Sequence, residues 1–133
     1  VFAENFVSDY LALLSAFQNL ESNPHIFVAL PIPIFSELGI QYAGNNPVEG
    51  LDLDSYEKTL SGGEGIIRSN IKAQLHDIAS SEGLDLIDFF ALFEGKPAMT
   101  YDGVHPNKEG AKLMAEEAAR VLKLRCDGLV VNE

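Results

Sequence analysis

The chain of 133 residues has the length of one globular domain or of part of one, since domains usually span about 100–200 residues. Its composition, with 47% hydrophobic and 22% charged residues, excludes a disordered, fibrous or low-complexity protein. The net charge of −11 makes nucleic acid and anionic membrane poor partners, because phosphate groups are bound by clusters of Lys and Arg.

Cysteine and histidine usage argues against a metal site. Cys126 is the only cysteine, which excludes an internal disulfide and a cysteine-rich zinc site. His25 and His76 have no Cys, Asp or Glu at metal-ligand spacing. We read His25 as a surface or capping residue and His76 as part of a solvent-exposed helix face. We therefore expect no metal and no cofactor. No signal peptide is recognisable, and the longest apolar run, 26–32, is too short to span a membrane, so the compartment stays open.

The first half of the chain predicts one helix, one strand and a long loop. Apolar residues at helical spacing predict a helix over 2–20, which the Ser-Asn-Pro at 22–24 ends. The run 26–30 lacks polar alternation, as is typical of a strand covered on both faces in a parallel sheet. Glycines and an Asn-Asn-Pro predict that 35–63 is the longest irregular region, and a long loop after a buried strand is often functional.

The second half alternates helix and strand. The patterns predict a helix over 67–78 that ends near Gly83, a strand over 84–88, a short helical turn over 89–93 and a last helix over 107–123. The order helix, strand, helix, strand, helix favours right-handed crossovers and a parallel α/β sheet. A sheet usually has about four to six strands, and this chain predicts two. The chain is therefore expected to be part of a larger doubly wound domain.

The segment Tyr-Asp-Gly-Val-His-Pro-Asn at 101–107 carries the clearest chemistry. Serine ester hydrolysis needs an imidazole that accepts the proton of the nucleophile and a carboxylate that holds the other ring nitrogen. Asp102 and His105 lie three residues apart in a Gly- and Pro-containing loop before a helix, so one turn can bring the carboxylate to Nδ1. Gly103 permits unusual backbone angles, and Asn107 is a good N-cap. Taken alone, the same pair also fits a purely structural hydrogen bond.

This segment, followed by Gly-Ala at 110–111 and an alanine-rich helix, resembles the last motif block of the SGNH (GDSL-type) esterases. Earlier blocks also resemble the family in the right order: a helix with Phe6, Asp9-Tyr10 and Leu13-Leu14, the strand and proline-rich exit at 23–33, and the helix and strand at 78–88. The carbohydrate acetyl-esterases are the most similar branch. The resemblance implies a flavodoxin-like α/β/α three-layer fold with a parallel sheet, of which this chain supplies about two strands and three helices.

The family's Gly-Asp-Ser nucleophile block and its oxyanion-hole Asn block are absent from this sequence. The resemblance therefore implies that 1–133 is the C-terminal part of a single SGNH-type domain. It implies a serine hydrolase of small acyl esters, with acetyl esters favoured, in which His105 is the general base and Asp102 orients it. The alternative is a truncated or degenerate, non-catalytic binding module. A phosphate-cofactor protein of the same fold lacks support, because no Gly-rich phosphate loop is present.

Several partners and contact residues follow from this interpretation. The expected ligand is a small ester, including acetylated carbohydrates. The missing N-terminal part of the domain, or a second copy, would cover an otherwise exposed sheet edge. Pro31, Pro33 and Phe35 follow the first strand and are candidates to line the substrate pocket, with a rigid strand exit as the competing role. Asp88 is read as a helix cap or loop residue rather than a site residue, and Tyr101 as support for the loop or cover for the site.

Overall fold

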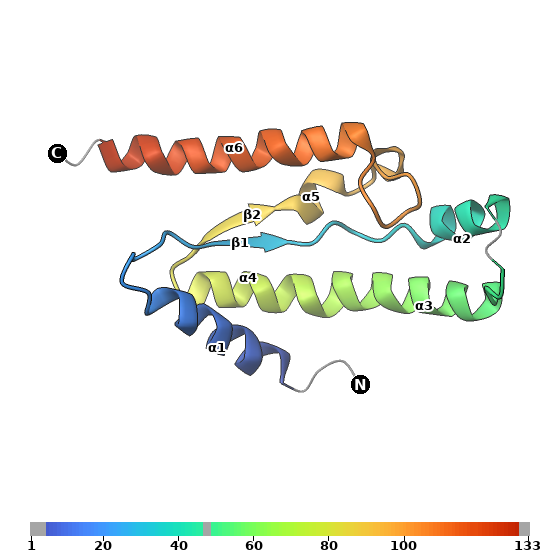
Figure 1. The fold of residues 1–133 in the computed structure, drawn as a ribbon, viewed down its shortest axis with the longest axis horizontal. Helices are drawn as coiled ribbons and strands as arrows, with labels where there is room; N and C mark the ends of the chain where they lie inside the picture. Colours follow the sequence, from blue (N-terminus) through green and yellow to red (C-terminus); the bar gives the residue numbers. More distant parts are fainter. Residues whose placement is uncertain (1–4, 47–48, 131–133) are drawn as a thin grey trace.

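The computed structural model describes residues 5–46 and 49–130. Helices lie on both sides of a pair of parallel strands (Figure 1). The elements in chain order are α1 (Phe6–Gln18), β1 (Phe27–Leu30), α2 (Ser36–Asn45), α3 (Leu53–Ile66), the π-helical segment η1 (Ile67–Ile71), α4 (Lys72–Ser81), β2 (Asp85–Asp88), α5 (Phe89–Phe93), the short 3₁₀ turn η2 (Pro97–Met99) and α6 (Lys108–Val130). The predicted mixed α/β class and the parallel pairing are confirmed. The expected three helices are too few for the described residues.

The two strands pair in a register that runs from Phe27 opposite Asp85 to Leu30 opposite Asp88. The chain between them passes through α2, α3, η1 and α4, and α4 packs on the strands from the side opposite α6 (Figure 1). Because the strands are parallel, their carboxyl ends lie at the same edge of the sheet. The loops that follow β1 and precede α6 meet beyond that edge, where Phe35 N–H donates to the carbonyl oxygen of Gly103 at 2.8 Å.

The core lies between β1, α4 and α5. Its buried cluster consists of Val28, Leu30, Leu75, Ala79 and Phe90, and partly buried side chains of α1 and η1 pack against it. Burial of apolar side chains contributes about 25 cal/mol for each Å² removed from water, so this cluster stabilises the packing of the helices on the sheet.

Burial along β1 differs from the prediction. Val28 and Leu30 are buried, but Ala29, whose side chain points to the other face, is exposed. The run of apolar residues therefore does not mean that both faces of this strand are covered within the described residues. It means instead that one face is in the core and the other borders an apolar groove.

The prediction of an irregular region over 35–63 is wrong. Most of it is helical, in α2 and α3. Asp52 provides the N-cap of α3, because its carboxylate accepts hydrogen bonds from Asp54 N–H at 3.2 Å and Ser55 Oγ at 2.7 Å. The glycines that suggested a loop include sites of close packing. A Cβ on Gly39 would lie 2.5 Å from Leu60 Cδ1, and one on Gly63 would lie 3.1 Å from Ile34 Cδ1.

The helix predicted over 67–78 is the last part of a longer one. Helices α3 and α4 join through η1 into a continuous rod (Figure 1). The rod ends at Ser81, near Gly83 as predicted. Gly83 has φ +64° and lets Leu84 N–H donate to Ala79 O at 2.8 Å. Asp88 also has its predicted role, because Oδ1 accepts from Ala91 N–H at 2.8 Å at the start of α5.

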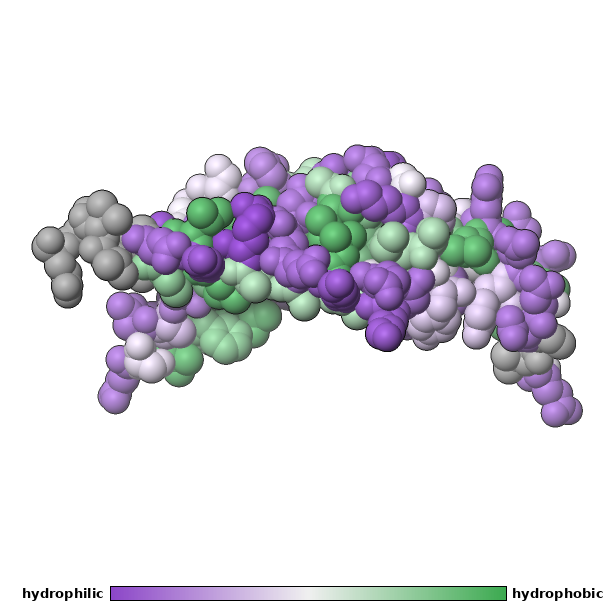
Figure 2. Space-filling model, turned by 90° about the horizontal axis from the view of Figure 1, so that it is seen from above, coloured by the Kyte–Doolittle hydropathy of each residue, from purple (hydrophilic) through white to green (hydrophobic). Residues whose placement is uncertain are grey.

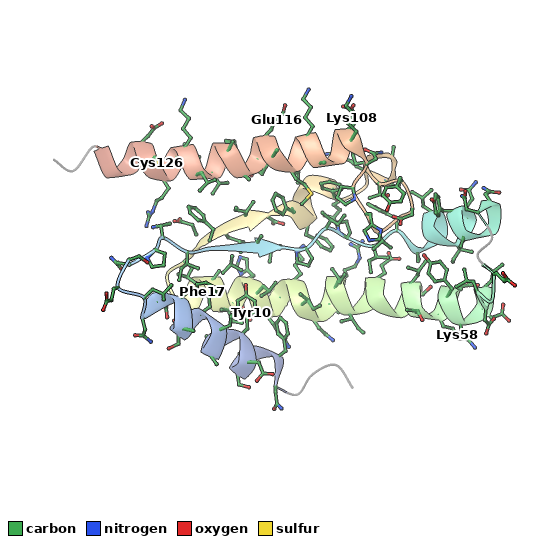
Figure 3. The ribbon with its side chains drawn as sticks, viewed as in Figure 1. Tyr10, Phe17, Lys58, Lys108, Glu116 and Cys126 are labelled. Carbon is green, nitrogen blue, oxygen red and sulfur yellow. The ribbon has the colours of Figure 1, made fainter. Side chains whose placement is uncertain are left out.

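The first and last helices are less deeply packed. Residues 2–4 of the first predicted helix lie outside the described residues, and α1 carries exposed apolar side chains, including Leu13 and Phe17. Tyr10 of α1 extends toward α4 in the side-chain view (Figure 3). Helix α6 runs seven residues beyond the predicted end at Lys123, to Val130. Its Lys108 and Glu116 point away from the strands (Figure 3), and the view from above shows a band of hydrophilic side chains flanked by hydrophobic ones (Figure 2).

Candidate functional site

Backbone pairing closes the loop that contains the predicted acid–base pair. Thr100 and Pro106 form an isolated antiparallel bridge, and Tyr101 N–H donates to His105 O at 3.1 Å. One residue further out, Asn107 N–H donates to Met99 O at 2.9 Å. Residues 101–105 are thus a short loop whose two ends are joined by backbone hydrogen bonds. These bonds restrict the directions in which its side chains can point.

Asp102 organises the inside of this loop. Its Oδ1 accepts from Val104 N–H at 3.0 Å and from His105 N–H at 2.7 Å, and its Oδ2 lies 2.7 Å from His105 Nδ1. The residue is buried. Burial by itself raises the pKa of the Asp102 carboxyl, but the hydrogen bonds from the backbone and ring of His105 and from Val104 N–H outweigh burial and hold that pKa below its usual range. The carboxylate therefore stays ionised and accepts all three bonds.

His105 has one tethered and one open ring nitrogen. Nδ1 faces the Asp102 carboxylate, which favours the tautomer with the proton on Nδ1 and leaves Nε2 as an acceptor. The His105 side chain is 62% exposed, and the described residues give Nε2 no hydrogen-bond partner. Chemically, this arrangement can take up a proton at Nε2 while the carboxylate stabilises the resulting imidazolium.

Two glycines and a capping asparagine allow this loop geometry. Gly103 has φ +79°, and a Cβ there would overlap the carbonyl oxygen of Phe35. Gly110, in the first turn of α6, packs so closely on the loop base that a Cβ would overlap the Met99 carbonyl oxygen. Asn107 caps α6 as predicted, with Oδ1 accepting from Gly110 N–H at 3.0 Å.

Two tyrosines lie beside the imidazole. The Tyr101 ring stacks on the His105 ring, with 5.7 Å between centroids and 16° between planes. Tyr42 of α2 meets Tyr101 edge-on at 5.9 Å. The sequence pointed to Tyr101 but not to Tyr42, because α2 was read as loop and its contact with residue 101 depends on tertiary packing.

The three residues predicted to contact substrate are not gathered in one place. Pro33 is fully buried, which puts its ring in the core. Phe35 lines a cavity of about 400 Å³ at the start of α2, where Ser36 Oγ donates to Glu64 Oε2 at 2.7 Å. The other residues of that cavity are Glu37, Leu38, Gln41 and Pro97, so no cationic side chain lines it.

Pro31 lines a different surface, an open apolar groove of about 500 Å³ along β1. Ala29 lines it, and so do Val104 and Pro106, which lie on either side of His105 in sequence. The remaining lining residues are Phe6, Tyr10, Leu30, Ile32, Ile67, Ile71, Leu75, Phe89 and Met114. We call this the β1 groove. Because β1 pairs only with β2 in the described part of the chain, its other edge has no strand partner there.

A second His–Asp pair lies away from the loop. His25 Nε2 is 2.7 Å from Asp85 Oδ2, and Arg125 Nε of α6 is 3.1 Å from the same oxygen. His25 precedes β1 and Asp85 begins β2, so this cluster is at the amino ends of the strands, opposite the loop. Sequence spacing alone could not identify it, because residues 25, 85 and 125 are far apart in the chain.

Among residues 5–46 and 49–130 no group of three or more His, Cys, Asp or Glu side chains is arranged to hold a metal ion. In the same ranges no helix has the length and apolar character needed to cross a membrane.

Comparison with known proteins finds a likeness of fold. No family model matches the sequence, and no curated protein matches it. The fold is similar to that of the esterase domain of the ZfL2-1 ORF1 protein from the zebrafish ZfL2-1 retrotransposon, with a TM-score of 0.59 and 19% sequence identity. The match covers 93% of this chain and 61% of that structure, so the chain spans about three-fifths of the domain that it resembles. The chain thus has a fold found in an esterase domain.

Proposed function

We propose that this chain carries the acid–base arm of a serine ester hydrolase of the SGNH type, with His105 as general base and Asp102 as its orienting residue. The observation that supports this most is the 2.7 Å contact of His105 Nδ1 with a buried carboxylate, combined with an exposed ring whose Nε2 has no partner among the described residues. The fold likeness to an esterase domain agrees with the proposal.

In the proposed reaction, Nε2 of His105 takes the proton of a serine hydroxyl as that oxygen attacks the ester carbonyl. The imidazolium then gives this proton to the departing alcohol, and the acyl group remains on the serine. A water molecule then attacks the acyl carbon and loses its proton to Nε2, and the imidazolium returns this proton to the serine oxygen as the bond to the acyl group breaks and the acid leaves. Asp102 remains ionised throughout, because its role is to hold the tautomer and stabilise the imidazolium.

The serine and the oxyanion hole would come from a segment outside this sequence. We propose that 1–133 is the C-terminal part of a flavodoxin-like, three-layer domain whose further strands add beside β1. The β1 groove supports this, because an unpaired strand edge next to apolar side chains suits an added strand. Parallel addition would bring the carboxyl end of the new strand near Val104 and Pro106, beside His105.

We propose a small neutral ester as substrate, with acetylated carbohydrates the favoured class. The net charge of −11 disfavours anionic substrates. The cavity at the start of α2 agrees with this class, because Glu37, Gln41 and Glu64 present acceptors for hydroxyl groups and Phe35 presents an apolar surface.

Hydrolysis of p-nitrophenyl acetate by the full-length protein that contains this chain tests the proposal. The His105→Ala variant should lower kcat/KM by about 100- to 10,000-fold, the usual contribution of a general base. His76→Ala is the matched control, because His76 is an exposed histidine of α4 that makes no contact with the loop. Equal turnover of the wild type and the His105 variant would rule out the general-base role.

A second candidate function is a non-catalytic binding module built on the same fold. The β1 groove favours it, since an open apolar surface of this size suits a protein partner, including a second copy of the chain. A full-length protein without hydrolytic activity toward acetyl esters, whose self-association or partner binding depends on the β1 groove, would favour this candidate over the first.

A further inference from the structure

The His105 ring has few contacts for a group proposed to move protons. Its side chain is 62% exposed, and the described residues give the ring one hydrogen bond, that of Nδ1 with Asp102. A single hydrogen bond leaves the imidazole free to tilt about that contact. Productive proton transfer requires Nε2 to stay aimed at one position, so a second restraint on the ring is needed.

Tyr101 provides a flat surface against this ring. The two planes differ by 16° and the centroids are 5.7 Å apart, an offset stack. Tyr101 N–H also donates to His105 O at 3.1 Å, so the backbone of both residues is tied as well. The two residues are thus joined at the backbone as well as through their rings.

Helix α2 also contacts Tyr101. Gly39 lies against the loop, where a Cβ would come within 3.1 Å of Asp102 O. Tyr42 follows one turn later on the same helix, and its ring meets Tyr101 edge-on at 5.9 Å with a 70° angle between planes. The order Tyr42, Tyr101, His105 is therefore a chain of ring contacts from a helix to the imidazole.

We propose that Tyr101 is a positioning residue for His105, with Tyr42 as its support. The stacked ring limits rotation of the imidazole and favours the tautomer in which Nδ1–H faces Asp102. When Nε2 accepts a proton, the face of the tyrosine ring also attracts the imidazolium. The catalytic consequence rests on the proposed role of His105 as general base, but the ordering of the ring does not.

Histidine ¹⁵N resonances test the ordering directly. The chain has three histidines, so His25 and His76 serve as internal reports on folding. At about pH 8, where histidine rings are ordinarily neutral, Tyr101→Leu should lower the ratio of Nδ1–H to Nε2–H tautomer of His105 by about two- to tenfold, the worth of one aromatic pair. Tyr101→Phe, which keeps the stacked ring, should retain the wild-type ratio. Tyr42→Leu should give a smaller change in the same direction.

The outcomes separate this proposal from the proposed function. An unchanged tautomer ratio in Tyr101→Leu, or an equal loss in Tyr101→Phe, would overturn the positioning role whatever the enzyme does. Where the full-length protein hydrolyses p-nitrophenyl acetate, Tyr101→Leu should lower kcat with little change in KM. A rise in KM at constant kcat would assign Tyr101 to substrate contact instead. Absence of hydrolysis would remove the proposed function but leave the spectroscopic result intact.

Discussion

Asp102 is the residue on which the loop depends most, since one buried carboxylate accepts three hydrogen bonds from two following residues. Three donors cluster around a single side chain, and two of them are backbone groups. Loss of the charge would leave these donors poorly matched, because an amide offers one acceptor oxygen and places a donor toward Nδ1–H. The loop geometry therefore depends on the Asp102 carboxylate being ionised.

The first prediction concerns Asp102→Asn and pH. The pKa of Asp102 is lowered in the folded protein, so its contribution to stability is present above the unfolded value of about 3.9 and is lost as pH falls through the folded value. The variant should therefore lower the free energy of unfolding by about 1–3 kcal/mol near pH 7, the usual effect of breaking bonds to a buried charged group. The difference should shrink below about pH 4.

Urea unfolding at about pH 7 and about pH 3 measures both quantities. Asp77→Asn, at an exposed position of α4, is the control for the general effect of removing one negative charge. A wild type and an Asp102 variant that differ by the same amount at both pH values would contradict the prediction.

The second prediction concerns Gly110. Alanine there would place a Cβ onto the Met99 carbonyl oxygen, and backbone at the base of the loop cannot rotate away as a side chain can. We expect Gly110→Ala to lower the free energy of unfolding by about 1–3 kcal/mol. The variant should also shift the His105 resonances, since α6 and the loop must separate. Thermal unfolding and ¹⁵N spectra check the two parts, and a fully stable variant would show that the contact relaxes at no cost.

The sequence predicted the contact of Asp102 with His105 and the cap at Asn107, because these hydrogen bonds join residues close together in the chain. Asp102 and His105 are three residues apart, and the cap at Asn107 involves the next turn of helix. The partners that come from elsewhere were not predictable in this way. Tyr42 reaches Tyr101, and Asp85 reaches His25, only after the sheet and helices assemble. A sequence pattern contains no signal for contacts at such separations.

At the scale of elements, the rod from α3 through η1 to α4 is the feature that the sequence misrepresented. Glycine usually indicates loops because it lowers helix stability by about 1 kcal/mol relative to alanine. Here Gly62, Gly63 and Gly65 all lie inside α3. The cap at Asp52 and burial of Leu60 indicate that tertiary packing outweighs that local preference.

The third prediction uses these glycines as a matched set. A Cβ at Gly62 or Gly65 would meet nothing within 4 Å, so alanine at either site should raise the free energy of unfolding by about 0.5–1 kcal/mol. Gly63→Ala should gain less, because its Cβ would press on Ile34 Cδ1 at 3.1 Å. Urea unfolding of the three variants checks this order. Equal gains at all three sites would show that Ile34 gives way freely.

At the scale of the whole molecule, the strands were predicted within a residue, but their surroundings were not. The apolar run at β1 indicated a strand covered on both faces, whereas Ala29 is exposed and borders the β1 groove. Within the described residues β1 is thus apolar on both faces but covered on only one of them. This is consistent with a match to only 61% of the similar esterase domain. The hydrophobic pattern of a sequence indicates which residues prefer burial, but it does not indicate which part of the protein, or which partner, covers them.

The fourth prediction follows from this edge. Within the described residues one edge of β1 has no strand partner. Such an edge beside apolar side chains is a site of self-association, and a lysine pointing out of the strand opposes it. We expect the 133-residue chain to form oligomers that grow with concentration, and Ala29→Lys to reduce them, as followed by light scattering on size-exclusion chromatography. Leu124→Lys, at a 61% exposed position of α6 outside the β1 groove, adds the same charge elsewhere and should leave oligomerisation largely unchanged.

Equal effects of the two lysine substitutions would assign the association to net charge rather than to β1. A wild-type chain that stays monomeric at all concentrations would show that the edge of β1 does not drive self-association. It would also count against the proposal that a further strand pairs with β1.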